Sequence, residues 1–340
     1  MTNESILIVS PTWIGDAVMC MPAVQLFRAE YPETEITMLA KPLVQSLWKM
    51  HPAIDHFQTL EKTFPTLGKL KQRHFDRAYI IPNSFRSAFL PFMAGIPKRI
   101  GARGHWRKWI LSEIPSFGTG HQQFEAMSIL GVQGTPKAPT LEVTKKSFQT
   151  LERKLAHFPS IGKSLISLFQ TLEKERPFGA RPVVTLLPGA ARGPSKRWPT
   201  ENFALLAKNL CSSLNAVVLL GGGPDDVAVC NDIEAEGYDI FNLAGQTTLS
   251  EWAAMLQMSH CVVSNDSGGM HLATAVGTPV VAIFGTTDPK KTGPLGKNIV
   301  LQKSEKQNRE IKRDSEEAVR ALRAVRVDEV FGAVKKLLPC

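Results

Sequence analysis

The chain has few cysteines, and their spacing excludes two classes of protein. Its 340 residues contain five cysteines, and no two of them form a Cys-x-x-Cys pair. Disulfide-rich secreted domains and thiolate metal centres need closely spaced cysteines, so neither is expected. A reducing cytoplasm is the compartment that this usage favours. The five are Cys20, Cys211, Cys230, Cys261 and Cys340.

Long apolar runs are lacking as well. No apolar stretch approaches the ~20 residues that a membrane-spanning helix needs. The first five residues, Met-Thr-Asn-Glu-Ser, carry no basic group of the kind that opens a secretory signal. We therefore expect a protein that is neither exported nor integral to a membrane.

Acidic residues are the minority among the charged ones. There are 31 of them against 40 Lys and Arg residues, which gives a formal net charge of +9. Such an excess favours polyanionic partners, namely nucleic acid, an anionic membrane face or phosphorylated substrates. The basic residues are not interleaved with an aromatic platform and lie on no recognisable helix-turn-helix, so nucleic acid is not an expected partner.

Short β-branched runs alternate with helical patterns in both halves of the chain. Strands that are apolar on both faces and separated by helices predict an α/β protein with two doubly wound, Rossmann-like domains. The polar stretch 144–176 holds no strand-like run and is expected to connect them. The expected strands are 6–9, 36–39, 78–81, 183–187, 216–220, 261–263 and 280–284, and the expected helices include 16–30, 201–211, 225–236 and 249–258.

Three loops that follow expected strands carry unusual chemistry. They are 11–16, 188–199 and 264–271. Ligands of open α/β sheets bind at the carboxyl ends of the strands, so we expect all three loops at a cleft between the domains.

The third of these loops, Ser-Asn-Asp-Ser-Gly-Gly-Met-His, leads into a helix-forming segment. Backbone amides at a helix N-terminus point at an anion, and Gly268 and Gly269 would let the backbone approach it closely. Asp266 or Ser267 could instead cap the first turn. Taken alone, the loop is explained equally well by a phosphate site and by an ordinary capped helix.

Six motifs, in order over most of the chain, resemble those of the ADP-heptose:lipopolysaccharide heptosyltransferases. The second loop, with Pro188-Gly189 and Lys-Arg-Trp-Pro, is more similar to type II of this family than to type I, although Ala191 and Arg192 replace an acidic and an aromatic residue. The motifs are Trp-Ile-Gly-Asp at 13–16, Gly-Ile-Pro-Lys-Arg-Ile-Gly at 95–101, Lys-Arg-Trp-Pro at 196–199, Asn-Leu-Ala-Gly-Gln-Thr-Thr at 242–248, 265–271, and Phe-Gly-Thr-Thr-Asp-Pro at 284–289.

The resemblance implies a GT-B glycosyltransferase, in which the two Rossmann-like domains face each other across a cleft. It implies inverting transfer of L-glycero-D-manno-heptose from ADP-heptose to heptosyl-Kdo2-lipid A, the second heptose of the lipopolysaccharide inner core. Residues 1–165 would then bind the acceptor and 177–320 the donor. Residues 321–340 would form a C-terminal helix, for which packing back on the first domain is one arrangement.

Sugar transfer from a nucleotide diphosphate needs a base for the acceptor hydroxyl and a positive charge for the departing diphosphate. Asp16 matches the acidic residue that serves as base in the family, while its alternative role is a helix N-cap. Lys196 is suited to the diphosphate or the transferred sugar, and a solvated loop lysine is the alternative.

The remaining donor contacts follow from the same picture. Asp266 would be repelled by a diphosphate and is therefore assigned to the heptose, with the amides of Ser267, Gly268 and Gly269 on the phosphates. His271 either donates to a phosphate or packs inside the protein. The turn Gly-Gly-Gly-Pro-Asp-Asp at 221–226 would bind the nucleotide through Gly222, with Asp225 or Asp226 on the ribose.

A basic cluster with two tryptophans, Trp106 and Trp109, begins within the second motif and extends beyond it. Because the implied acceptor is lipid-linked, we expect the cluster to bind acceptor phosphates and Kdo carboxylates at the inner leaflet of the cytoplasmic membrane. A solvated basic face is the alternative. The protein would then be cytoplasmic and peripheral to that membrane. The cations are Lys98, Arg99, Arg103, Arg107 and Lys108.

No cofactor or metal site is expected. The chain has no Asp-x-Asp pair, and a helix dipole with Lys196 can neutralise the diphosphate, which leaves assistance by a divalent cation open. A nicotinamide-dependent oxidoreductase is disfavoured, because no Gly-x-Gly-x-x-Gly follows the first strand. A non-catalytic sugar-nucleotide-binding protein, which would not need Asp16, and type I transfer to Kdo2-lipid A remain alternatives.

Overall fold

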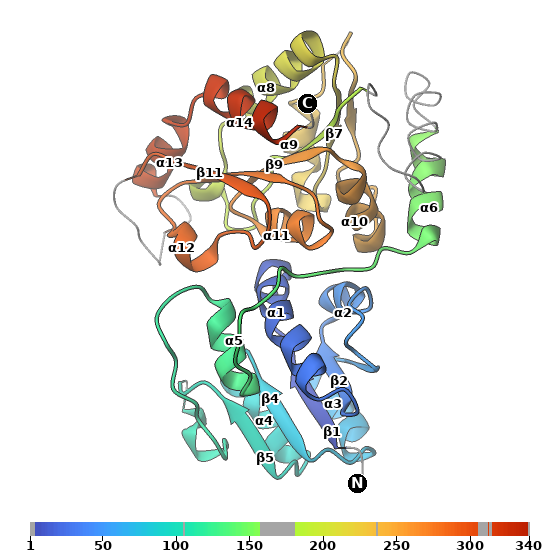
Figure 1. Ribbon diagram of the computed structural model, residues 1–340, viewed down its shortest axis with the longest axis vertical. Helices are drawn as coiled ribbons and strands as arrows, with labels where there is room; N and C mark the ends of the chain where they lie inside the picture. The colour runs from blue at the N-terminus through green and yellow to red at the C-terminus, as the bar shows by residue number, and fades with distance from the viewer. Residues whose placement is uncertain are drawn as a thin grey trace. The chain divides into compact units, whose positions relative to one another are not determined.

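The computed structural model describes residues 4–104, 106–156, 181–235, 237–304, 312 and 315–338. Contacts gather the chain into two compact units, Met1–Glu142 and Val143–Cys340 (Figure 1). The expected domain boundaries at 165 and 177 lie outside the described residues. Helix α6 (Lys145–Leu155), which we had placed in the first domain, packs against α10 (Leu249–Met258) of the second unit.

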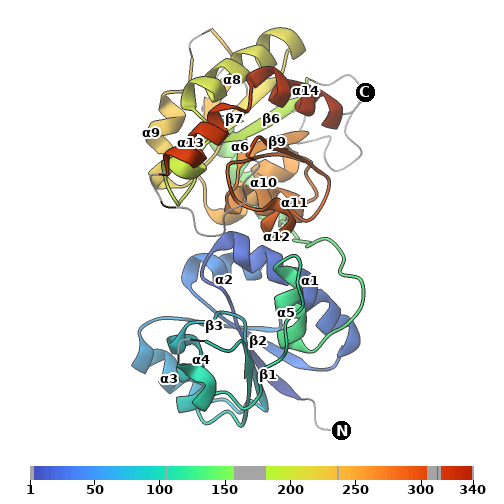
Figure 2. The ribbon, with the colours of Figure 1, turned by 90° about the vertical axis from the view of Figure 1, so that its left-hand side faces the viewer.

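The first unit is built on one parallel sheet with the strand order β3-β2-β1-β4-β5. Helices α1 and α5 lie on one side of this sheet, and α3 and α4 lie on the other (Figure 2). Its strands are β1 (Ser5–Val9), β2 (Glu35–Ala40), β3 (His56–Thr59), β4 (Arg77–Ile80) and β5 (Lys98–Gly101). Its helices are α1 (Ile14–Glu30), α2 (Pro42–Trp48), α3 (Thr63–Lys71), α4 (Phe85–Met93), the 3-10 turn η1 (Arg107–Trp109) and α5 (Gln123–Leu130).

The core of the first unit explains why β1 reads as a continuous apolar run. Ile6, Leu7 and Ile8 have no exposed surface, because helices cover both faces of the central strand. Leu7 packs in one cluster with Leu70 and Leu90 from the α3 and α4 side. Such burial on both faces is characteristic of a parallel sheet.

The second unit holds a six-stranded parallel sheet with the order β11-β10-β9-β6-β7-β8. Its strands are β6 (Val183–Leu187), β7 (Val217–Leu220), β8 (Ile240–Asn242), β9 (Cys261–Asn265), β10 (Val280–Phe284) and β11 (Asn298–Gln302). Its further helices are η2 (Pro194–Lys196), α8 (Thr200–Leu214), η3 (Pro224–Asp226), α9 (Val227–Asn231), α11 (Gly268–Ala275), α12 (Pro289–Thr292), α13 (Glu316–Arg323) and α14 (Val327–Leu337).

The C-terminal helix belongs to the core of the second unit. Val330, Val334 and Leu337 of α14 pack in the same apolar cluster as β6, β9 and β10, and α14 contacts α8, β9, β10 and β11. This placement differs from packing on the first domain, the arrangement considered from the sequence. The apolar stripe of α14 has its partner within the second unit.

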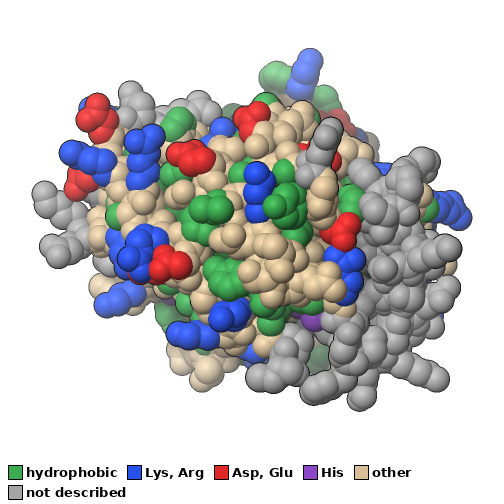
Figure 3. All heavy atoms as spheres, turned by 90° about the horizontal axis from the view of Figure 1, so that it is seen from above, with side chains coloured by type: hydrophobic (Ala, Val, Ile, Leu, Met, Phe, Trp, Pro, Cys, Tyr) green, Lys and Arg blue, Asp and Glu red, His purple; other side chains and the backbone are tan. Residues whose placement is uncertain are grey.

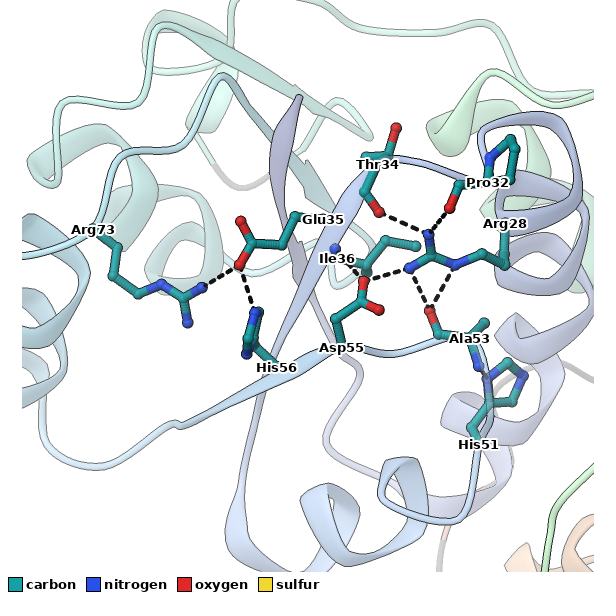
Figure 4. Close-up of polar contacts among 10 residues, drawn as sticks. All are labelled: Arg28, Pro32, Thr34, Glu35, Ile36, His51, Ala53, Asp55, His56 and Arg73. Carbon is teal, nitrogen blue, oxygen red and sulfur yellow. Dashed lines mark hydrogen bonds and ion pairs between the residues drawn. The ribbon is translucent and has the colours of Figure 1, made fainter. Parts of the chain in front are cut away.

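A polar network ties the end of α1 to the neighbouring strands (Figure 4). The Arg28 guanidinium donates to the carbonyls of Thr34 at 2.7 Å, Pro32 at 2.8 Å and Ala53 at 3.0 Å. It also donates to the Asp55 carboxylate at 2.5 Å. One side chain therefore satisfies several backbone oxygens that no sheet ladder would reach.

None of the helices in the described part of the chain is long and apolar enough to cross a membrane.

Candidate active site

Each sheet has one point where the strand order reverses. The reversal lies between β1 and β4 in the first unit and between β6 and β9 in the second. Open α/β sheets bind their ligands beside such a point, at the carboxyl ends of the strands. The three loops selected from the sequence follow β1, β6 and β9, so all three lie at these reversals.

Asn265, the last residue of β9, fixes the loop that follows β6. Its side chain is buried and donates to the Pro188 carbonyl at 2.7 Å. The Trp198 backbone N–H donates to its carbonyl oxygen at 2.9 Å, so one amide holds both ends of the loop. The Trp198 indole is itself buried and donates to the carbonyl of Val325 at 2.8 Å. Trp198 is thus an anchor for the loop that carries Lys196.

Lys196 and Asp266 form a buried ion pair. The Asp266 carboxylate accepts from Lys196 Nζ and also from Thr287 Oγ1 at 2.6 Å. The side chains are only 13% and 8% exposed, so the pair lies where a charge-assisted contact is strong. Loops after three adjacent strands, β6, β9 and β10, thereby converge on one carboxylate.

The start of α11 lies beside this pair. Ser267 occupies the N-cap position but makes no side-chain hydrogen bond to the first turn. Ser267 therefore does not cap the helix with its side chain. Gly269 also has a packing role, because an added Cβ would lie 2.5 Å from Leu187 and 3.2 Å from the Trp252 ring. His271 is buried on the same helix, 4% exposed.

The glycine-rich turn after β7 encloses Asp226. The Gly223 N–H donates to the Asp226 carboxylate at 3.0 Å, and a Cβ on Gly222 would lie 2.6 Å from the Asp226 side chain. A Cβ on Gly189, in the loop after β6, would overlap the same carboxylate. Burial raises the pKa of Asp226, while the Gly223 N–H and the Arg197 charge act in the opposite direction. Asp225 is exposed.

Arg197 links the two turns. Its guanidinium donates to the Ala190 carbonyl at 3.3 Å and lies 3.9 Å from the Asp226 carboxylate. Adjacent residues therefore reach opposite neighbours of β6, since Lys196 contacts Asp266 after β9 and Arg197 faces Asp226 after β7. The carboxyl ends of the strands in the second unit thus bring together two carboxylates, two cations and the amides of a helix N-terminus. These groups suit a polar, phosphorylated ligand.

Comparison with known proteins identifies the family. The model of glycosyltransferase family 9 (heptosyltransferase) matches residues 66–320. Lipooligosaccharide heptosyltransferase 2 of Haemophilus ducreyi is 32% identical over 318 residues, which cover 87% of each chain. Lipopolysaccharide heptosyltransferase 2 of Escherichia coli K12 is 32% identical over 304 residues, 85% of each. This chain belongs to glycosyltransferase family 9. It is therefore an enzyme, a heptosyltransferase.

The fold agrees with that assignment. The solved E. coli ADP-heptose lipopolysaccharide heptosyltransferase II has a TM-score of 0.81 against this chain at 26% identity, covering 98% of each. The E. coli heptosyltransferase solved with ADP shares the fold, with a TM-score of 0.73 at 17% identity. The expected GT-B class, with two parallel α/β sheets, is confirmed.

In the first unit of this heptosyltransferase, Asp16 lies in the first turn of α1. The N-cap position belongs to Trp13, which makes no side-chain cap bond, so Asp16 is not the N-cap that was weighed as its alternative role. The side chain is half-buried and, one turn away, its charge contributes to the raised pKa of the buried Cys20 thiol. Asp16 thus follows β1 at the reversal point of the first sheet.

The basic cluster does not lie on one surface, and the expectation for Arg107 is wrong. Arg107 has no exposed surface; it donates to the carbonyl of Pro82 at 2.5 Å and to that of Ser84 at 3.3 Å. Burial lowers its pKa to about 10, and its Nε and Nη2 have no partner among the described residues. Charge density along the sequence could not distinguish this interior cation from its exposed neighbours.

The other cations of the cluster divide into two groups. Arg99 is half-buried, and its guanidinium donates to the carbonyls of Ile96, Pro97 and Ile110. Lys98, Arg103 and Lys108 are exposed.

Sequence reasoning missed Thr287 and Arg197. Thr287 stands in a quoted motif, Phe-Gly-Thr-Thr-Asp-Pro, but had no assigned role. Arg197 stands in the motif Lys-Arg-Trp-Pro, also without an assigned role, and only the turn after β7 reveals its partner. Within the described residues, no three His, Cys, Asp or Glu side chains gather as a metal site.

Proposed function

We propose that this heptosyltransferase transfers L-glycero-D-manno-heptose from ADP-heptose to heptosyl-Kdo2-lipid A and so adds the second heptose of the lipopolysaccharide inner core. The observation that carries the proposal is the identity of 32% with the E. coli heptosyltransferase 2. The E. coli heptosyltransferase 3 is 22% identical. The enzyme would work in the cytoplasm, peripheral to the inner face of the cytoplasmic membrane.

The first unit would supply the base. In an inverting displacement the acceptor hydroxyl oxygen attacks the anomeric carbon of the heptose as the bond from that carbon to the diphosphate breaks. ADP leaves with the bonding electron pair, and the hydroxyl proton passes to the Asp16 carboxylate. Asp16 fits this role because it is half-buried at the reversal point of its sheet and is not the N-cap of α1.

The second unit would hold the donor. The amides of Ser267, Gly268 and Gly269 would bind the phosphates at the positive end of α11. Lys196 would neutralise the departing diphosphate, and Asp266 would accept from heptose hydroxyls. In the structure these two form an ion pair with each other, so we infer that donor binding lengthens this pair as Lys196 turns to a phosphate.

The nucleoside would lie over the glycine turns. Asp226, aligned by Gly223 and enclosed by Gly189 and Gly222, would accept from ribose hydroxyls. Asp225, which is exposed, is the less favoured of the two acids. His271 would support the phosphate amides from within α11. Lys196 and the helix amides compensate the diphosphate charge, so the proposed reaction needs no cofactor.

Release of ADP from ADP-heptose by the purified protein, measured with different acceptors, tests the proposal. We expect release with heptosyl-Kdo2-lipid A and little with Kdo2-lipid A. Faster release with Kdo2-lipid A would assign the protein to the first heptose. Binding of ADP without release on either acceptor would make it a sugar-nucleotide-binding protein.

A further inference from the structure

The positive charge of the protein is concentrated in one part of the first unit. Residues 62–112 contain 11 Lys and Arg residues and one acidic residue, Asp76. The whole chain has 40 basic and 31 acidic residues, so the remaining sequence has 29 basic and 30 acidic ones and is nearly neutral. The end of the molecule shown in Figure 3 has Lys and Arg side chains interspersed with Asp and Glu. Lys69, Arg73 and Arg77 pair with acids outside this range, and Arg107 is buried. The exposed cations that remain are Lys62, Lys71, Arg86, Lys98, Arg103 and Lys108.

The elements of this range also expose five large aromatic side chains. Phe64 at the start of α3 is 83% exposed, and Trp106 and Trp109 at η1 are 88% and 78% exposed. On α4, Phe85 and Phe92 are exposed by 44% and 41%. Helix α4 contacts α3, β5 and η1, so the elements that carry these side chains adjoin one another.

The spacing on α4 produces an apolar outer stripe. Phe85, Phe92 and Met93 are exposed, and their spacing places them on one side of the helix. Phe89 lies between them and is partly buried against the core of the unit. Phe85 and Phe89 stack with ring centroids 5.7 Å apart. Ala88 and Leu90 are buried towards the sheet. Helix α4 is therefore apolar on its buried side and on part of its exposed side. An exposed apolar stripe of this kind is expected to have a binding partner.

Cations lie directly beside these rings. Lys108 Nζ is 4.7 Å from the centre of the Trp109 ring, and the Arg99 guanidinium is 5.4 Å from that of Phe92. Lys62 and Lys71 at the two ends of α3 are exposed as well. Aromatic rings that enter the headgroup layer next to cations that meet lipid phosphates are the pattern of a membrane interface.

Trp106 adds an observation from the backbone. It has a positive φ of 60°, one of two such non-glycine residues in the described part of the chain. The left-handed region is costly for a bulky side chain, and here it holds a ring that is almost fully exposed. Strain that presents an apolar ring to solvent points to a function for that ring.

We propose that the face formed by α3, α4 and η1 is a docking surface for anionic lipid bilayers, into which Phe64, Trp106 and Trp109 insert. The exposed cations around them bind the lipid phosphates. This deepens the proposed function, since a lipid-linked acceptor has to be reached at a membrane. It requires neither Arg107, which is buried, nor the donor site.

Flotation with vesicles of phosphatidylcholine, with and without phosphatidylglycerol, tests the surface. The variant Phe64→Ser, Trp106→Gly, Trp109→Ser removes the inserting rings, and glycine at 106 relaxes the left-handed backbone, so folding is preserved. We expect it to lose binding to anionic vesicles by at least tenfold. The matched control Leu205→Ser, which removes an exposed side chain of α8 in the second unit (50% exposed), should bind like the wild type.

A variant that lacks two lysines is the second test of the surface. Lys62→Gln with Lys71→Gln should weaken binding to anionic vesicles about fivefold for each cation removed, with little effect at high salt. Lys335→Gln with Lys336→Gln, two exposed lysines of α14, is the charge-matched control. Wild-type-like binding by the aromatic variant, or equal losses in both lysine pairs, would overturn the proposal. The vesicles contain no acceptor, and ADP binding is measured on each variant, so a failure here is distinct from a failure of the proposed function.

Discussion

At the scale of single residues, the account depends most on Asp16. We predict that Asp16→Asn lowers kcat by about 10²–10⁴-fold, the usual effect of losing a general base. Donor affinity should hardly change, because the base acts on the acceptor proton. Steady-state kinetics and ADP titration measure the two quantities. Wild-type turnover would leave Asp16 with only its position in the first turn of α1.

His51 predicts how the stability of the first unit depends on pH. Burial lowers its pKa to about 4, against about 6.5 in an unfolded chain. The folded state therefore binds fewer protons between these values. The contribution of His51 to the free energy of unfolding is fully present above pH ~6.5. It is lost as the pH falls towards 4, by roughly 3 kcal/mol at most.

The variant His51→Gln tests this pH dependence, because it removes the titrating group and retains an acceptor for the Ala53 N–H. Chemical denaturation between pH 4 and pH 7 should show a flatter stability profile for this variant. His74→Gln replaces an exposed histidine of the same unit and should retain the wild-type slope. Equal slopes for both variants would show that His51 does not set the profile.

Single residues also show the limit of sequence reasoning. Asp16, Lys196 and Asp266 were selected from their positions after strands, and the structure places them at the reversal points of the two sheets. Arg107 was assigned to a surface, yet it lies in the interior. A basic side chain next to tryptophans reads the same whether it faces water or backbone carbonyls, because its burial is decided by the loop after β4.

At the scale of elements, the loop after β6 separates two kinds of donor contact. Lys196→Ala should lower kcat and raise KM for ADP-heptose together, with a loss in kcat of about 10²-fold, because the lysine stabilises charge that develops in the transition state. Arg197→Gln should raise KM three- to tenfold with little change in kcat, since this side chain positions Asp226.

The comparison of these neighbours includes a folding control. Lys196→Ala leaves the buried Asp266 without its cation, which is destabilising, so thermal unfolding of each variant is measured beside its kinetics. Lys196→Met with Asp266→Asn removes both charges and should restore stability without restoring kcat. Identical kinetic effects of the Lys196 and Arg197 variants would contradict the division of roles.

The strands that the sequence predicted are the inner ones. All seven expected runs became β1, β2, β4, β6, β7, β9 and β10. The four strands missed, β3, β5, β8 and β11, are the edges of the two sheets. Three of them, β3, β5 and β11, are partly exposed, and β8 is buried but only three residues long, so none has the long buried run of the inner strands. Their pairing is decided by the neighbouring strand.

At the scale of the whole molecule, two similar sheets carry different chemistry. The first unit combines an acid at its reversal point with a basic, aromatic face, while the second combines helix amides with the paired Lys196 and Asp266. An acceptor-binding unit at a lipid surface and a donor-binding unit for a soluble sugar nucleotide would need this division. A transferase reaction requires both.

The most direct measurement of the central claim is the mass of lipopolysaccharide cores from cells that lack this protein. The account predicts cores that stop after a single heptose, restored by the wild-type protein and not by Asp16→Asn. Cores of unchanged mass, or cores that end at Kdo without any heptose, would contradict the assignment to the second heptose.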